Sequence, residues 1–83
     1  MVGDYLAGLR AAASYTQQHV ADRLGCSRAT VGHWETGEVR ISAHDLDRYL
    51  DAVFATVWER DRALRLAGET TEPTGQNVTG GEE

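Results

Sequence analysis

The chain has 83 residues and a mass of 9.1 kDa, which limits it to one small domain and excludes a large enzyme with its own cofactor domain. Apolar residues make up 41% of it, enough for a compact but thin helical core. No apolar stretch approaches the roughly 20 residues of a membrane span, and the N-terminus lacks the basic start and long apolar segment of a signal peptide. We therefore expect a cytoplasmic protein without membrane contacts.

The net charge of −5 is unevenly distributed along the chain. Residues 1–68 contain all eight arginines and nine acidic residues, a balance of −1, whereas residues 69–83 contain four glutamates and no base. The second segment has a single large apolar residue, Val78, and cannot offset the entropy cost of ordering. The pattern predicts a folded domain at 1–68 and a disordered acidic tail at 69–83. Because a nearly neutral domain can carry a basic face, the charge does not exclude a nucleic-acid partner.

Side chains that support catalysis or metal binding are sparse. Cys26 is the single cysteine and is interpreted as a small core residue, with a redox sensor as a remote alternative. The histidines His19, His33 and His44 are 14 and 11 residues apart, far from the short spacing of a helical metal site. No nucleophile, base and orienting residue occur together. We therefore expect no enzymatic activity, no cofactor, no metal site and no evident small-molecule ligand.

The first three predicted helices are short and have recognisable ends. Asp4 is expected to cap the first, which runs through DYLAGLRAAA until Ser14 breaks it. Thr16 is a suitable N-cap for the second, which ends at Gly25, and Ser27 caps the third, RATVGHWE. The expected inward positions of the second and third helices are Val20, Ala21, Leu24, Val31 and Trp34.

The C-terminal part of the predicted domain permits one helix or two. Ser42 with Asp45 has the form of a capping box, and residues 43–67 contain neither glycine nor proline. A second box, Thr56 with Glu59, indicates a break near Ala55. Apolar residues at steps of three and four fit one continuous helix: Leu46, Leu50, Val53, Val57, Leu64 and Ala67. Both alternatives stay open, and the absence of alternating β-branched runs makes the fold all-α.

An ordered set of residues around the second and third helices carries the functional signal: Leu9-Arg10, Thr16-Gln17, Ala21, Leu24-Gly25, Ser27, Val31 and Trp34-Glu35-x-Gly37. A small residue at Ala21 lets the two helices cross, and Gly25 accepts the left-handed conformation of the sharp turn. Over residues 4–67 the chain resembles the lambda-repressor-like helix-turn-helix proteins, the Cro or Xre family. The resemblance implies a five-helix domain that binds double-stranded DNA with its third helix in the major groove.

The resemblance also assigns roles to individual residues. It implies base reading by Arg28, Ala29, Gly32 and His33 and phosphate contacts from Thr16, Gln17, Gln18, Ser27 and Arg40. Arg10 and Glu35 match a structural pair that ties the first helix to the end of the third. His33 has the alternative of a surface residue without a DNA contact. The chain departs from the family pattern at Ser14 and Ser42, where glycine and proline are common, and at Ala55-Thr56, which lacks the usual glycine between helices four and five.

A DNA-binding regulator of this size is expected to act as a homodimer. Trp58, Leu64 and Leu66 exceed what a small bundle can bury and are predicted to form the dimer interface. Phe54 and Trp58 have the alternative of core positions. The predicted function is a sequence-specific transcriptional regulator that represses from a palindromic operator. The alternatives are an antitoxin or a protein-interaction module that keeps the helix-turn-helix fold.

Overall fold

The computed structural model describes residues 1–71, and the side chains of residues 1–68. It contains five helices: α1 (Val2–Ala12), α2 (Gln17–Leu24), α3 (Arg28–Thr36), α4 (Ala43–Ala52) and α5 (Val57–Thr71). Residues 1–71 contain no strand, and the predicted all-α, five-helix fold is confirmed. Helix α5 runs past the boundary expected at residue 68. The rest of the predicted acidic tail lies outside the described residues.

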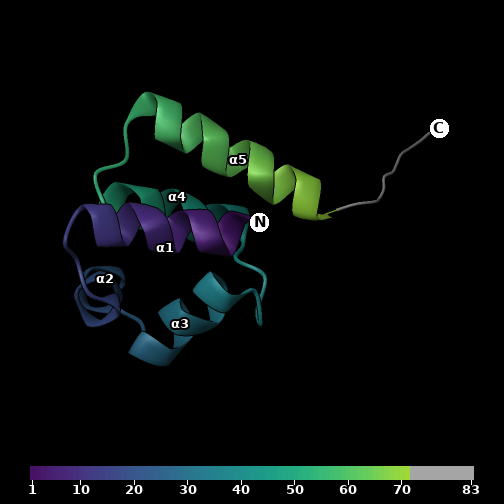
Figure 1. Cartoon of the computed structure of the whole chain (residues 1–83). Coiled ribbons are helices and arrows are strands. Elements are labelled where there is room, and N and C mark those ends of the chain that lie inside the picture. Colours follow the sequence, from purple (N-terminus) through teal and green to yellow (C-terminus); the bar gives the residue numbers. More distant parts are fainter. Residues whose placement is uncertain (72–83) are drawn as a thin grey trace.

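The helices are arranged on both sides of a central pair (Figure 1). Helices α1 and α4 lie in the middle of the view, with α5 on one side and α2 and α3 on the other. Helix α1 contacts α3 and α5, and α2 contacts α3 and α4. The core is formed by inward residues of all five helices together with Ile41 and Val53, which lie outside the helices: Val2, Leu6, Val20, Ala21, Leu24, Val31, Trp34, Ile41, Leu46, Tyr49, Leu50, Ala52, Val53 and Ala63.

The predicted N-caps of α2, α3 and α4 are confirmed. Thr16 Oγ1 accepts the N–H of His19 at 3.0 Å, Ser27 Oγ accepts that of Thr30 at 3.1 Å, and Ser42 Oγ accepts that of Asp45 at 3.1 Å. Each bond satisfies one of the N–H groups that a helix leaves unpaired in its first turn.

The chain breaks between α4 and α5, which decides between the two alternatives for residues 43–67. The Thr56–Glu59 capping box is complete: Thr56 Oγ1 accepts the N–H of Glu59 at 3.1 Å, and Glu59 Oε1 accepts the N–H of Thr56 at 2.8 Å. Helix α4 ends two residues before Phe54, which adopts φ 56°. The Ala55 N–H then bonds the Leu50 carbonyl at 3.0 Å, closing the end of α4 without a glycine.

Helix α1 ends in the same way, at the position where the resemblance led us to expect glycine. Ser14 has φ 64°, and the Tyr15 N–H donates to the Arg10 carbonyl at 3.0 Å. A left-handed conformation costs a residue with a Cβ roughly 1–2 kcal/mol relative to the right-handed one. The helix therefore keeps the left-handed ending that glycine usually provides, at the cost of local backbone strain at Ser14.

The predicted start of α1 at Asp4 is wrong. The helix begins at Val2 with Met1 as N-cap, which makes no side-chain capping bond, and Asp4 lies in the first turn. Tertiary packing explains the earlier start, because Val2 and Gly3 are buried. A Cβ added to Gly3 would lie 2.5 Å from the Trp34 carbonyl oxygen and 2.6 Å from that of Glu35. Glycine at position 3 thus lets the backbones of α1 and α3 approach closely.

The break also changes which side of α5 is buried. Val57 is 79% exposed and Leu64 is 50% exposed, whereas Ala63 is fully buried. The prediction that Val57 and Leu64 belong to the inward face of one continuous helix is therefore wrong. A new helix begins at Val57 and does not continue the phase of α4. Trp58, at 83% exposure, and Phe54, at 65%, are not core residues. The Phe54 ring is nevertheless covered by the Arg23 guanidinium, 5.1 Å from its centroid.

Candidate nucleic-acid interface

A sharp turn sets the angle between α2 and α3. Gly25 adopts φ 72°, and the N–H of Cys26 bonds the Ala21 carbonyl at 3.0 Å. Ala21 and Val31 are fully buried, so the helices cross at a small residue as the sequence predicts. Cys26 is half-buried against the core, and burial raises the pKa of its thiol. The two helices therefore form one rigid unit with α3 on its outer side.

A buried carboxylate holds α3 against α1, α2 and α4. Glu35 is only 6% exposed, and Arg10 donates to it twice, from Nε to Oε2 at 2.7 Å and from a terminal nitrogen to Oε1 at 3.0 Å. Tyr49 donates its hydroxyl to Oε2 at 2.6 Å, and Gln17 donates from Nε2 to Oε1 at 3.0 Å. Arg10 also donates to the Tyr15 carbonyl at 2.8 Å. The expected Arg10–Glu35 contact is thus present and belongs to a larger network.

The network keeps Glu35 charged. Burial raises the pKa of Glu35, but the hydrogen bonds from Arg10, Gln17 and Tyr49 outweigh this effect and lower it overall. The hydrogen bond to Glu35 raises the pKa of the Arg10 guanidinium. Burial, followed by the bond to Glu35, raises the pKa of the Tyr49 phenol. The ion pair therefore persists at neutral pH and fixes the end of α3.

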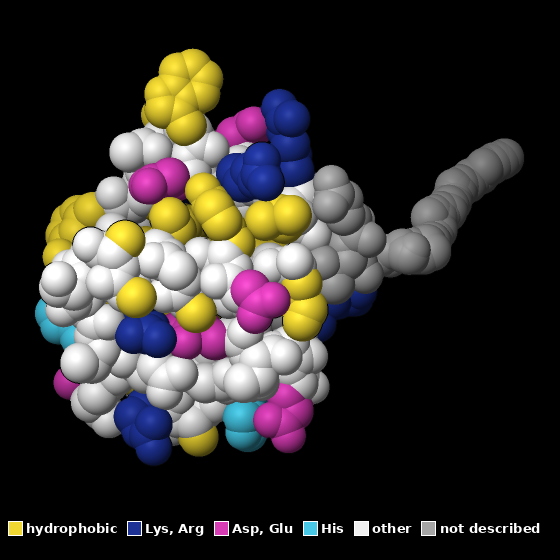
Figure 2. Space-filling view, viewed as in Figure 1, with side chains coloured by type: hydrophobic (Ala, Val, Ile, Leu, Met, Phe, Trp, Pro, Cys, Tyr) yellow, Lys and Arg dark blue, Asp and Glu magenta, His cyan; other side chains and the backbone are white. Residues whose placement is uncertain are grey.

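The residues expected to read bases share the outward side of α3. Arg28, Ala29 and His33 are exposed, and Gly32 is half-buried between them. A terminal nitrogen of Arg28 donates to Gln17 Oε1 at 3.2 Å, and Nε2 of His33 lies 3.7 Å from a Glu38 carboxylate oxygen. In Figure 2, basic side chains lie at separate points on the lower half of the molecule, with a histidine beside an acidic side chain at the lower edge.

Gly32 is not required by the packing within the chain. A Cβ at this position would lie 3.7 Å from both terminal atoms of the Gln17 side chain, which is ordinary van der Waals contact. Its φ is not among the positive values of residues 1–71, so the backbone would also accept alanine. Since glycine costs a helix about 1 kcal/mol relative to alanine, its use here is unexplained by the fold alone.

Most residues expected to contact phosphate already use their side chains in hydrogen bonds within the chain. Gln17 is bonded on both sides, to Glu35 and Arg28, and Gln18 Nε2 donates to Asp22 at 2.7 Å. The hydroxyls of Thr16 and Ser27 are used as N-caps. In contrast, the backbone N–H groups of Gln17 and Gln18 lie in the first turn of α2, where the helix provides no acceptor. These two N–H groups, with the positive end of the helix dipole, are suited to an anion.

Arg40 lies in the loop between α3 and α4. It is exposed and makes no ion pair with any described side chain, residues 1–68, and neither does Arg28. Three arginines of α4 and α5 are paired instead: Arg48 with Asp45, Arg60 with both Asp47 and Asp51, and Arg65 with Asp61. The two arginines on the α3 side therefore remain available to an external anion.

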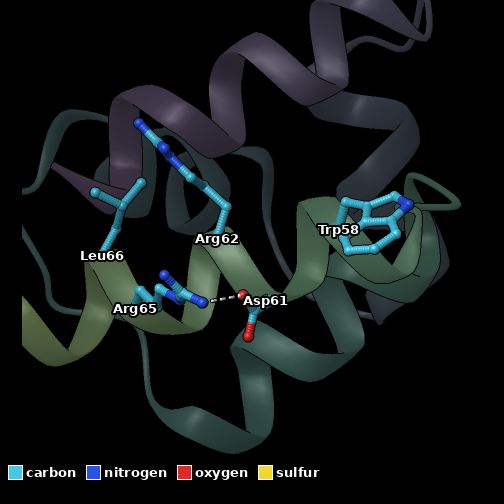
Figure 3. Close-up of a pocket in the computed structure, with 5 residues that line it drawn as sticks. All are labelled: Trp58, Asp61, Arg62, Arg65 and Leu66. Atoms are coloured by element: carbon cyan, nitrogen blue, oxygen red, sulfur yellow. Dashed lines mark ion pairs between the residues drawn. The ribbon is translucent and has the colours of Figure 1, made fainter.

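The three residues predicted to form a dimer interface do not share one surface. Trp58 and Leu66 line a cavity of 370 Å³ with Asp61, Arg62 and Arg65 (Figure 3). Leu64 lines a separate cavity of 260 Å³, between α5, the N-terminus of α1 and the start of α4. In Figure 3, Trp58 and Leu66 lie at opposite ends of this stretch of α5, and Arg62 and Leu66 point toward α1.

Two important residues were not identified from the sequence. Tyr49 is fully buried, its ring meets Trp34 edge-on at 6.5 Å, and its hydroxyl bonds Glu35. The signal was its position three residues after Leu46, on the inward stripe of α4. Arg48 donates to the Leu24 carbonyl and so ties α4 to the C-terminal end of α2. This contact has no local sequence signal, because its partner is a backbone atom far away in the chain.

Comparison with known proteins identifies the family. Within residues 1–71 no helix is long and apolar enough to cross a membrane, and the described side chains, residues 1–68, contain no cluster of three His, Cys, Asp or Glu residues that could hold a metal ion. No curated protein and no solved structure matches the chain. A family model described as helix-turn-helix domain matches residues 2–65, more than three quarters of the chain, and spans the α2–turn–α3 unit. The chain therefore belongs to the helix-turn-helix domain family, whose fold supports a role as a DNA-binding regulator.

Proposed function

We propose that the chain is a sequence-specific DNA-binding transcriptional regulator of the Cro or Xre type, and that it represses from a palindromic operator. The observation that carries the proposal is the outward side of α3, where Arg28, Ala29 and His33 are exposed on a helix fixed by the buried Glu35. Arg28 has the paired donors that suit guanine O6 and N7, and Ala29 offers a methyl group to thymine. We keep the cytoplasm as the proposed location.

Phosphate contacts would fix the register of α3 on the duplex. We assign them to the backbone N–H groups of Gln17 and Gln18 and to the guanidinium of Arg40, with the capping hydroxyls of Thr16 and Ser27 in support. The Gln17 side chain has a second task in this proposal, because it bonds both Glu35 and Arg28 and so holds the base-reading arginine in place.

A homodimer follows from the size of the binding surface, because one α3 helix reads only a few base pairs. For both α3 helices to meet one duplex, the two-fold axis has to run from the α5 side toward the α3 side. The interface then lies on the flank where α5 borders α1, and we place its centre at Trp58 and Leu66, apart from Leu64.

The DNA-binding proposal is tested by selecting bound sequences from a pool of random duplexes with the full chain. We expect an enriched motif with two inverted half-sites whose centres lie about one helical turn apart. Enrichment of a single half-site would contradict the palindromic operator. The absence of any enriched sequence would contradict the function and favour the protein-interaction alternative.

The interface is tested separately by sedimentation of the full chain and two single variants. Trp58→Ala should convert a dimer into a monomer with unchanged helical content, because the side chain is 83% exposed and contributes nothing to the core. Leu64→Ala is the matched control on the other cavity and should leave the dimer intact. A monomeric parent chain, or dimer loss in Leu64→Ala alone, would contradict this assignment.

A further inference from the structure

The cavity that contains Leu64 has the composition of a ligand site. Its walls come from Val2 of α1, Ile41 of the α3–α4 loop, Ala43 and Leu46 of α4, and Leu64 and Ala67 of α5. At 260 Å³ it lies just below the range of sites for drug-sized molecules, which suits a ligand of one or two rings. Leu64 is half exposed because its side chain faces this space.

The polar end of the cavity is positive. Arg40 is the one charged residue among the described side chains that line it, and no carboxylate among the side chains of residues 1–68 pairs with Arg40. Ala43, which also lines the cavity, is the first residue of the ten-residue helix α4. The positive end of the α4 dipole therefore adds to the charge of Arg40. An apolar space with a cation at its edge matches a molecule with an apolar body and one negative group.

We propose that this cavity binds a small apolar carboxylate, with the ring or chain against Ile41, Leu46 and Leu64 and the carboxylate on Arg40. Residues 72–83 are an alternative occupant, because they carry acidic groups and follow α5 in the sequence, but their only large apolar residue is Val78. Trp58 of a second copy is less suited, because it belongs to the separate cavity on the α1 flank.

Occupation of the cavity would weaken DNA binding. This step rests on the proposed function, in which Arg40 contacts phosphate. A carboxylate paired with Arg40 competes with the DNA phosphate for the same donors. By thermodynamic linkage, DNA must then lower the affinity for the carboxylate by the same factor by which the carboxylate lowers the affinity for DNA. The ligand would therefore act as an inducer that releases a repressor from its operator.

The binding step is tested with 1-naphthoate as the probe and the uncharged 1-naphthamide as its control. Titration of the full chain, followed by NMR of the methyl groups, should give saturable shifts at Ile41, Leu46 and Leu64. We expect the amide to bind about tenfold more weakly, as for the loss of one charged hydrogen bond. Shifts without saturation, or shifts centred on Leu66 and Trp58, would overturn the site.

Two variants connect the binding to the proposed groups. In Ala43→Leu, the larger side chain fills the cavity from an exposed position, and the affinity for naphthoate should fall at least tenfold. Ala11→Leu is the control: residue 11 is exposed on α1 outside the cavity, and the affinity should not change. Arg40→Gln should abolish the preference for the acid over the amide. Equal binding by the parent chain and Ala43→Leu would overturn the proposal. A tenfold gain of naphthoate affinity in Val78→Ala would assign the cavity to the chain's own C-terminal segment and would also overturn it.

The coupling is tested on operator DNA. Saturating naphthoate should weaken DNA binding at least threefold in the parent chain and leave Ala43→Leu unaffected. Naphthoate binding without an effect on DNA would overturn the inducer role. If the chain bound naphthoate but no DNA sequence, the proposed function would fail while the ligand site stood.

Discussion

The arginines on the two sides of the molecule have different partners. On the α3 side, Arg28 and Arg40 are exposed, and none of the carboxylates described, up to residue 68, pairs with them. On α4 and α5, Arg48, Arg60 and Arg65 each pair with one or two aspartates. Arg62, which lines the same cavity as Trp58, is an exception on α5, because no described side chain forms an ion pair with it.

The difference is built into the position of the acidic residues. On the α3 side, Glu35 faces the core, where its negative charge is paired with Arg10 and is therefore not available to Arg28. On α4 and α5 the aspartates lie at least partly exposed, either one turn from an arginine of the same helix or, on α4, opposite Arg60 of α5. A chain with a net charge of −5 can thus present isolated cations on one side, which is where a phosphate backbone would need them.

The largest effect is expected from Arg10→Ala. Glu35 would keep its charge in a buried site without its main partner, and we expect the free energy of unfolding to fall by about 3–5 kcal/mol. Denaturant unfolding of the single variants and of the double variant with Glu35→Gln gives the coupling energy. A loss below about 1 kcal/mol, or no coupling, would mean that the pair does not hold α3.

Acid should also destabilise the fold through the Glu35 network. The loss of stability should be smaller than in Arg10→Ala, because protonation of Glu35 removes its charge but leaves both side chains in place. The folded-state pKa of Glu35 is lowered, so its contribution to stability is complete above the ordinary glutamate pKa of about 4.3 and is lost as the pH falls through the lowered value. Thermal melting between pH 7 and pH 3 should show a steeper decline in the parent chain than in Glu35→Gln. Parallel curves would contradict this account.

Arg28→Ala should weaken binding to the selected operator by about 1–3 kcal/mol and relax discrimination at one base pair of each half-site, with the fold unchanged. Arg65→Ala is the matched control, because Arg65 is also exposed but is paired with Asp61 and lies on α5. Equal losses in the two variants would remove the distinction between free and paired arginines.

Gly32→Ala should increase the stability of the fold and decrease its affinity for DNA. We expect the free energy of unfolding to rise by about 1 kcal/mol, because α3 gains a better helix former and the new Cβ has room beside Gln17. DNA affinity should fall if the glycine is there for close approach to the duplex. A more stable variant that binds the operator as well as the parent would exclude that role.

The smallest effect is expected from neutralising a paired arginine. The Arg65–Asp61 pair has a 3.0 Å contact, but both side chains are more than half exposed. Such pairs contribute about 0.5 kcal/mol or less, so Arg65→Ala should leave the unfolding midpoint almost unchanged. A loss above about 1 kcal/mol would show that the paired arginines hold the fold together, and the comparison between the two sides would need revision.

Features set by local hydrogen bonds were predictable from the sequence. The caps at Thr16, Ser27 and Ser42 and the turn at Gly25 depend on a few neighbouring residues, and all are present. The Arg10–Glu35 contact came from the family resemblance, because no local rule joins residues 25 positions apart.

Features set by long-range packing were not predictable. The early start of α1 depends on the contact of Gly3 with the α3 backbone, and no pattern around Asp4 indicates it. The exposure of Val57 and Leu64 follows from the phase of α5, which is set only after Phe54 breaks the chain in a left-handed conformation. The division of the predicted interface between two cavities is a consequence of that phase.

The central claim is that the α2–α3 side, with its unpaired arginines, is the surface that meets DNA. NMR of the full chain titrated with a duplex that carries one selected half-site tests it directly, because a half-site does not require the dimer. The account predicts the largest amide shifts at residues 16–18, 27–33 and 40, with the stretch of α5 from Trp58 to Arg65 unchanged. Shifts concentrated on α5, or uniform shifts that random duplexes reproduce, would contradict it.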